Sequence, residues 1–217
     1  MFYVNLKYLK RKVFTVDKIS VIVPCFNEED VLPLFYQEVT KVLESIENTT
    51  YELLFINDGS SDHTEDLIKL MAHKNKQCFY YSFSRNFGKE AAMYAGLENA
   101  TGDYVVIMDA DLQHPPYLLK EMYRSLKEEN YDCSAGKRID RTGEGKLRNF
   151  LSHSFYKVIQ TLTKMDMDDG AGDFRMMTRQ MVDAILELKE YNRYMKGLFS
   201  FVGFNTKWLE FHNVERQ

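Results

Sequence analysis

Short apolar runs alternate along this chain with longer segments whose apolar residues recur every three or four positions. The short runs predict buried strands at 19–24, 51–56, 78–83, 104–108 and 132–136. The segments between and after them predict helices at 28–47, 64–73, 88–100 and 115–127. Such an alternation of strand and helix is typical of an α/β fold. We therefore expect a mostly parallel, doubly wound sheet with helices on both faces.

The pattern is less regular in the second half of the chain. Residues 137–145 (KRIDRTGEG) combine charges with glycines and predict a loop, whereas 146–163 carry one apolar helical face. That face is typical of a core helix, with a helix lying on a membrane surface as the alternative. A short strand at 173–177 and a helix at 179–189 are predicted next. Residues 192–204 are rich in aromatic side chains with basic neighbours, a composition that suits a membrane interface.

Composition and charge narrow the class of protein. The chain has 217 residues, of which 45% are hydrophobic and 28% charged, so a single domain with a full core is expected at 19–217. A net charge of -4 argues against a general nucleic-acid binder. Residues 1–18 hold five basic side chains and one acidic side chain. This basic N-terminal lead-in is either a solvated approach to the first strand or a contact with anionic lipid.

Clusters of polar residues follow three of the predicted strands. They lie at 25–28, 57–62 and 109–113. Because the carboxyl ends of parallel strands meet at one edge of a sheet, we expect a ligand site there. Asp109 and Asp111 are one residue apart after a buried strand, and Gln113 adds a neutral oxygen. These oxygens suit Mg²⁺ or Mn²⁺, with an ordinary solvated turn as the structural alternative.

Other charged side chains near these clusters are further candidates for ligand binding. Asp58 ends the second strand at a glycine turn, while helix capping explains the neighbouring 60–62. Lys89 stands at a predicted helix start, where its positive charge would suit an anionic ligand. Arg138 and Arg141 are three residues apart in a glycine-bearing loop. They predict either a phosphate-binding loop or a solvated charged loop.

Four motifs, in this order and spacing, resemble those of family 2 glycosyltransferases. They are VIVPCFNEE, INDGSSDHT, SRNFGKEAA and MDADLQHPP. The likeness is greatest to the branch that makes polyisoprenyl-phosphate sugars, which includes dolichol-phosphate mannose synthase and bacterial undecaprenyl-phosphate glycosyltransferases. It covers 19–217, since GKRIDRTGEG, GDFRMM and NRYMKGLFSFVGF also look like this branch.

The resemblance implies a GT-A type nucleotide-diphospho-sugar transferase fold, with inverting chemistry and a UDP- or GDP-sugar donor, UDP being preferred. Residues 19–136 would form the nucleotide-sugar-binding half and 137–217 the acceptor-binding half. The residues that it implies around the nucleotide are Pro24, Phe26, Glu28, Ile56, Asp58, Asp109, Ala110 and Arg216. Asp111 and Gln113, with Asp109, would hold Mg²⁺ or Mn²⁺. Phe26 stands where relatives often have tyrosine, so a hydroxyl contact is missing there.

The acceptor that the resemblance implies is a polyprenyl phosphate at the cytoplasmic face of the cell membrane. A lipid phosphate is already anionic and mainly needs cations to position it. Arg138 and Arg141 match the arginines that this branch uses around the phosphates. Asp173 would orient the sugar or the acceptor, or act as a base, with a structural helix-turn cap as the alternative. These three residues and Asp111 form the implied catalytic set.

Two other functions stay open at this point. A soluble family 2 glycosyltransferase acting on a saccharide hydroxyl in cell-surface polysaccharide synthesis would share every nucleotide motif. A non-catalytic nucleotide-sugar sensor is disfavoured by the intact Asp58, Asp109 and Asp111. Relatives of this branch usually continue into two hydrophobic helices, and this C-terminal membrane segment is absent from the chain. We therefore expect that it was removed or that this member works without it. The base, the sugar and a homo-oligomer remain open.

Overall fold

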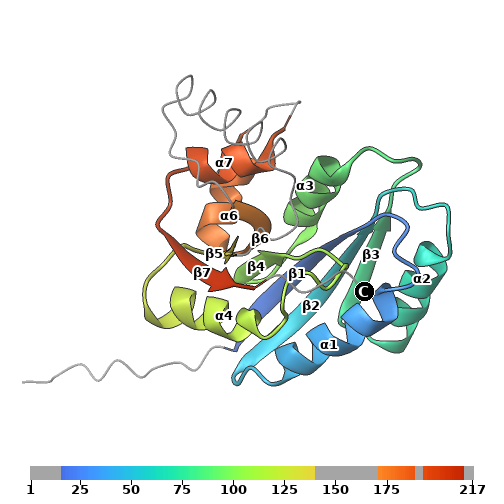
Figure 1. Cartoon of the computed structure of the whole chain (residues 1–217), viewed down its shortest axis with the longest axis horizontal. Coiled ribbons are helices and arrows are strands. Elements are labelled where there is room, and N and C mark those ends of the chain that lie inside the picture. Colours follow the sequence, from blue (N-terminus) through green and yellow to red (C-terminus); the bar gives the residue numbers. More distant parts are fainter. Residues whose placement is uncertain (1–15, 140–170, 189–192, 213–217) are drawn as a thin grey trace, which may run out of the picture.

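The structure, a computed structural model, describes residues 16–139, 171–188 and 193–212. The strands of these residues are β1 (Asp17–Cys25), β2 (Thr49–Asn57), β3 (Cys78–Ser82), β4 (Tyr104–Ile107), β5 (Cys133–Arg138), β6 (Ala171–Thr178) and β7 (Thr206–Phe211). The helices are α1 (Leu32–Glu44), α2 (Thr64–Lys74), α3 (Lys89–Asn99), α4 (Leu118–Glu128), α6 (Arg179–Leu186) and α7 (Met195–Phe201). Figure 1 shows these helices arranged around one twisted sheet.

The sheet has the strand order β3-β2-β1-β4-β6-β5-β7. Strands β1 to β4 pair in parallel, and β7 pairs in parallel with β5. Strand β6 is antiparallel to both β4 and β5, so among the described strands it alone runs in the opposite direction. The predicted α/β class, with a mostly parallel, doubly wound sheet, is confirmed.

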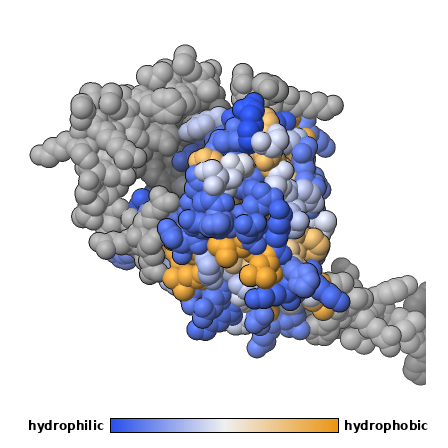
Figure 2. Space-filling model, turned by 90° about the vertical axis from the view of Figure 1, so that its right-hand side faces the viewer, coloured by the Kyte–Doolittle hydropathy of each residue, from blue (hydrophilic) through white to orange (hydrophobic). Residues whose placement is uncertain are grey.

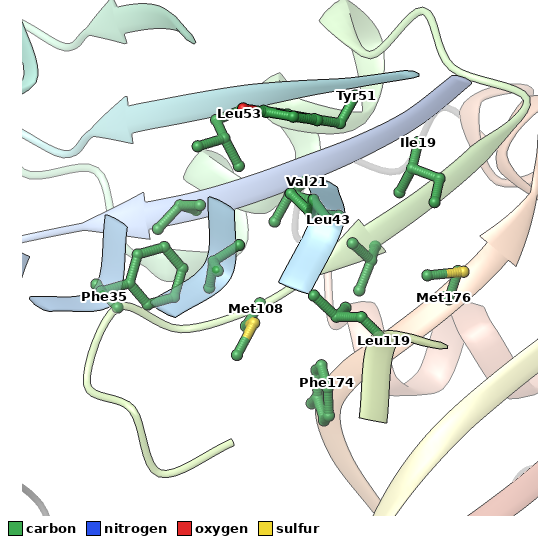
Figure 3. Close-up of a cluster of buried hydrophobic side chains, with 14 of the residues drawn as sticks. Ile19, Val21, Phe35, Leu43, Tyr51, Leu53, Met108, Leu119, Phe174 and Met176 are labelled. Carbon is green, nitrogen blue, oxygen red and sulfur yellow. The ribbon is translucent and has the colours of Figure 1, made fainter. Parts of the chain in front are cut away.

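Alternating side chains of the central strands build a separate apolar core on each face of the sheet. Ile19 and Val21 of β1 point to one face, where they pack with residues of α1, α2 and α4. Figure 3 shows this layer, with Phe35 and Leu43 of α1 over the strands. Ile22 points to the other face, where α3, α6 and α7 supply the partners. The predicted covering of both faces by helices is therefore present.

Several elements differ from the sequence-based expectation. Helix α7 was not predicted, and β5 runs to Arg138, although a loop was predicted from residue 137. The helix expected at 28–47 begins only at Leu32, because Asn27 has a left-handed backbone (φ 55°) and a turn follows it. Strand β7 was not predicted, although Leu209 is buried and Glu210 exposed in the alternation of a half-buried strand. The helix expected at 146–163 lies outside the described residues.

The face of the molecule that carries α2 and β3 is largely hydrophilic. Figure 2 shows apolar areas there that are small and separated by polar ones. Leu70 of α2 and Phe79 of the edge strand β3 are among the exposed large apolar side chains. Within the described ranges, none of the helices combines the length and the apolar character needed to cross a membrane.

Helix α3 lies close to β1 because Gly96 faces that strand. A Cβ atom at Gly96 would lie 2.2 Å from Cγ2 of Ile22, whose side chain is fully buried. Alanine in place of a helical glycine gains about 1 kcal/mol of helix propensity. Overpacking a core costs about 1–3 kcal/mol. The cost of overpacking a side chain at position 96 is therefore larger than the helix propensity that is lost by having glycine there.

A distance of 2.2 Å places the overpacking in the upper part of its range, about 2–3 kcal/mol, so after the gain in propensity we expect Gly96→Ala to lower the free energy of unfolding by about 1–2 kcal/mol. Chemical denaturation measures this change. Glu98→Gln, at an exposed position of the same helix, is the control and should stay within about 0.5 kcal/mol of the wild type. A Gly96→Ala protein as stable as the wild type would contradict the close packing of α3 on β1.

Candidate active site

The loops after β1 and β2 are joined by hydrogen bonds between side chains and backbone. The Asn27 side-chain oxygen accepts a bond from the Ser61 N–H at 2.8 Å, and the Asn27 N–H donates to the Ser60 hydroxyl at 3.0 Å. The Glu28 N–H donates to the Thr64 hydroxyl at 2.8 Å. The polar residues that follow these two strands therefore form one hydrogen-bonded unit, in which Ser60 and Ser61 contact Asn27.

Asp58 joins a third segment to this unit. Its carboxylate is buried and accepts hydrogen bonds from the backbone N–H groups of Phe87 at 2.7 Å and Gly88 at 2.9 Å. Next to it, Gly59 has a φ of 68°, and a Cβ atom there would lie 2.4 Å from the backbone carbonyl carbon of Arg85. Asp58 thus hydrogen-bonds the segment before α3, and Gly59 allows this segment to pack closely against the end of β2.

The register of the sheet brings two carboxylates together. Ile107 of β4 lies opposite Arg175 of β6 in an antiparallel ladder. Continued by two residues, this register sets Asp109 opposite Asp173, where like charges repel. The Lys89 ammonium lies between them, 2.7 Å from each carboxylate. Lys89 therefore links the end of β4 to β6.

The pKa values of this group reflect burial opposed by charge. Burial lowers the pKa of Lys89, but the carboxylates of Asp109 and Asp173 raise it by more, so this pKa lies above its ordinary value. Burial likewise raises the pKa of Asp173, but the nearby cations Lys89, Lys196 and Arg175 together lower it by more, so it lies below the ordinary value. Both groups are therefore charged near neutral pH.

The loop after β4 is held by its own contacts. Leu112 has a left-handed backbone (φ 55°), and the Gln113 N–H donates to the Asp111 carboxylate at 3.1 Å. Arg138 donates to the Gln113 side-chain oxygen at 3.3 Å. The buried His114 ring stacks on Phe174 with 4.8 Å between ring centroids, and burial lowers its pKa. The packed His114 ring is therefore neutral near pH 7.

These segments surround a cavity of about 300 Å³ at the carboxyl ends of the strands. Its walls are formed by Pro24, Cys25, Phe26, Glu28, Asp58, Asn86, Gly88, Lys89, Ala92, Asp109, Ala110 and Asp111. Eight of these were predicted from the sequence as nucleotide, metal or catalytic residues. Asn86 was missed, although it lies in the same SRNFGKEAA motif as Lys89.

The other predicted site residues do not line this cavity. The Ile56 side chain is fully buried in the core, and Gln113 and Arg138 contact each other beside Asp111. Asp173 joins the site through Lys89. Arg141 and Arg216 lie outside the described residues. The site roles predicted for all of these residues remain predictions.

The residues present fit a hard divalent cation that is only partly ligated by protein. Asp109 and Asp111 line the same cavity and offer carboxylate oxygens. Among the residues that the structure describes, no three His, Cys, Asp or Glu side chains are placed to hold a metal ion. Mg²⁺ characteristically binds through one or two carboxylates together with phosphate oxygens and water. The site therefore suits a cation that enters with a diphosphate.

Helix α7 packs against both α3 and β6 beside the site. The Met195 N–H donates to the Glu90 carboxylate at 2.7 Å, and burial raises the pKa of Glu90. The Arg175 guanidinium is buried and lies 3.9 Å from the centroid of the Phe199 ring. Burial lowers the pKa of Arg175, and its N–H donates to the Gly172 carbonyl at 2.9 Å. Helix α7 therefore covers a buried cation.

Fold and site together define a class of protein. A doubly wound sheet with a cavity at the carboxyl ends of its strands, lined by carboxylates and a lysine, is the arrangement of a nucleotide-binding α/β protein. The comparison with protein families narrows this class, because residues 20–186 match the model of glycosyl transferase family 2. The chain belongs to this family.

Two curated relatives agree with this assignment. CsbB of Bacillus subtilis (strain 168) is 46% identical over 199 residues, which are 92% of this chain and 60% of that protein. The prophage bactoprenol glucosyl transferase homolog of Escherichia coli (strain K12) is 39% identical over 203 residues, covering 92% and 64%. The chain thus spans less than two thirds of these relatives. The resemblance to the polyisoprenyl-phosphate branch is confirmed.

The GT-A type fold is confirmed by a solved structure. The mannosyltransferase PcManGT from Pyrobaculum calidifontis, in complex with GDP-Man and Mn²⁺, superposes with a TM-score of 0.64 at 18% identity. The match covers 92% of this chain and 57% of that one. At this identity the likeness concerns the fold.

We expect Asp58→Asn to loosen the segment before α3, since an amide replaces one acceptor oxygen with a donor that faces a backbone N–H. The free energy of unfolding should fall by about 1–3 kcal/mol, and the amides of Phe87 and Gly88 should exchange hydrogen faster. Hydrogen exchange measured by NMR tests this. Asp66→Asn, on the exposed face of α2, is the control. Unchanged exchange at both amides would rule out the proposed role of Asp58.

Proposed function

We propose that this chain transfers a sugar from a nucleotide-sugar to a polyprenyl phosphate, at the cytoplasmic face of the cell membrane, with a UDP-sugar as the preferred donor. The observation that carries the proposal is the cavity whose walls combine Asp109 and Asp111 with Lys89. The name of the E. coli relative, a bactoprenol glucosyl transferase homolog, supports the acceptor class and suggests glucose as the sugar.

On the donor side, different walls of the cavity would contact different parts of the nucleotide. Pro24, Phe26 and Glu28 follow β1 and would border the base and ribose. Asp58 keeps the segment before α3 in place, so that Asn86 and Lys89 face the cavity. Phe26 is 45% exposed and offers an aromatic face against which a base can stack.

Asp109 and Asp111 would hold Mg²⁺ or Mn²⁺ through their carboxylates. When bound, such an ion supplies positive charge against the negative charge that develops on the departing nucleoside diphosphate. Lys89 contributes a further positive charge on the same side of the cavity. Gln113 would add a neutral oxygen ligand, in which case it exchanges its contact with Arg138.

Transfer with inversion needs an acceptor oxygen that attacks the anomeric carbon from the side opposite the leaving diphosphate. A phosphate oxygen already carries charge and needs no base, whereas a saccharide hydroxyl does. Asp173 is the acceptor-side carboxylate, and its pKa is held below the ordinary value, which makes it a weak base. This favours the phosphate acceptor over the alternative of a saccharide hydroxyl. Asp173 would orient the sugar or acceptor instead.

The segment around α7 supports a membrane-side location for the acceptor. Phe201 is 61% exposed and Tyr194 is 37% exposed, and Lys196 lies on the same helix. Aromatic side chains with a basic neighbour suit the headgroup region of a bilayer. The acceptor lipid would approach from this side, next to Asp173 on β6.

Calorimetric titration with UDP-glucose, UDP-N-acetylglucosamine and GDP-mannose tests the donor, each in Mn²⁺ and in EDTA. We expect one nucleotide-sugar to bind in Mn²⁺ and to bind at least about tenfold more weakly in EDTA. Asp111→Asn should lose this metal dependence. Incubation with polyprenyl phosphate and with saccharide acceptors then identifies the acceptor. Absence of binding by all three donors, or transfer only to a saccharide hydroxyl, would contradict the proposal.

We expect Arg138→Ala to impair use of the lipid phosphate by about 10–100-fold in kcat/KM, the value of a charge-assisted hydrogen bond to phosphate. The affinity for nucleotide should change by less than about threefold. Arg124→Ala, on an exposed side chain of α4, is the matched control. An equal loss of nucleotide affinity in Arg138→Ala would move Arg138 to the donor site.

A further inference from the structure

Lys89 holds a position that the proposed cation also needs. Its ammonium lies 2.7 Å from the Asp109 carboxylate, and Asp109 is one of the two carboxylates proposed to bind Mg²⁺ or Mn²⁺. Two cations on one carboxylate repel each other and compete for its oxygens. The contact of Lys89 with Asp109 is therefore expected in the site without a bound cation.

The backbone below Lys89 is fixed, so the side chain decides which partner the ammonium contacts. The Gly88 N–H is bound by Asp58, and Lys89 is the first residue of α3, which Gly96 packs closely on β1. The Lys89 side chain is 40% exposed and has several rotatable bonds. It can leave one carboxylate without any movement of the helix.

Its second partner is a carboxylate that needs a cation. Asp173 is buried to a greater extent than Asp109, with side-chain exposures of 14% and 25%. One Asp173 oxygen contacts Lys89, and the other is buried without a hydrogen-bond partner. Removing the ammonium from Asp173 would leave a buried charge unpaired, at a higher cost than removing it from Asp109.

We propose that Lys89 is a positioning residue that exchanges partners when the donor site is loaded. It holds Asp109 and Asp173 together in the empty site, gives Asp109 up to the divalent cation, and stays paired with Asp173. The repulsion between the two carboxylates is thus neutralised by the lysine alone before loading, and by the lysine and the cation together afterwards. The exchange rests on the proposed function, because it requires a cation at Asp109.

The affinity for Mn²⁺ alone, without nucleotide, tests the exchange, with free Mn²⁺ measured by electron paramagnetic resonance. Lys89→Met removes the competitor, so we expect it to bind Mn²⁺ about tenfold more tightly than the wild type. Lys89→Arg restores a competing cation and should return the affinity to within about threefold of the wild type. Lys196→Met is the control, since Lys196 is also a cation near Asp173 that lowers the pKa of this residue. It should change the affinity by less than about threefold.

Asp173→Asn provides a second test that keeps the lysine. Without its second carboxylate, Lys89 pairs with Asp109 alone and competes more strongly, so Mn²⁺ should bind about three- to tenfold more weakly. Thermal unfolding checks that each variant is folded at the temperature of measurement. This variant also covers the case in which Lys89→Met fails to fold.

The outcomes separate the exchange from the proposed function. If Lys89→Met binds Mn²⁺ no more tightly than the wild type, while the wild type still binds a nucleotide-sugar with Mn²⁺, the exchange is wrong and the donor site stands. An equal gain in Lys89→Met and Lys196→Met would also overturn it, since a general loss of positive charge would then explain the result. If the wild type binds neither Mn²⁺ nor a nucleotide-sugar, both proposals fall.

Discussion

Repulsion between carboxylates is the constraint around which this site is arranged. The register of β4 and β6, continued beyond the ladder, sets Asp109 opposite Asp173, and Asp111 follows Asp109 by two positions. Such a concentration of negative charge at a sheet edge is stable only if cations accompany it. Lys89, on the third element α3, supplies this positive charge and thereby links the end of β4 to β6.

The position of Lys89 depends in turn on structural contacts, which are backbone hydrogen bonds and close helix packing. Asp58 holds the backbone just before the lysine, and Gly96 sets the distance between α3 and β1. Both residues act through fixed backbone geometry, which is more rigid than contacts between long side chains. Asp58 shows that a residue lining the cavity can also hold the neighbouring backbone in place.

The sequence predicted most of the fold and much of the cavity because the evidence was local. Alternating apolar runs predicted the strands and helices of the first half, and polar residues directly after three strands predicted the cavity wall. The arrangement of β6 was not predictable in this way, because its insertion between β4 and β5 depends on pairing between distant segments. The contact of Lys89 with Asp173 has the same origin, since 84 positions separate the two residues. Asn86 was missed for a different reason: of the residues in its motif, only Lys89 was assigned a role.

Helix α7 covers the Arg175 guanidinium, and this burial changes what it costs to lift the helix. A buried guanidinium has lost its hydration, and the Phe199 ring, the Gly172 carbonyl and Cys133 replace it only in part, since Nε of Arg175 has no hydrogen-bond partner. When α7 separates from β6, apolar contact at Phe199 is lost, but Arg175 regains water. Local opening there is therefore cheaper than the apolar contact alone would suggest. Opening of α7 would leave the pairing of the sheet strands unchanged.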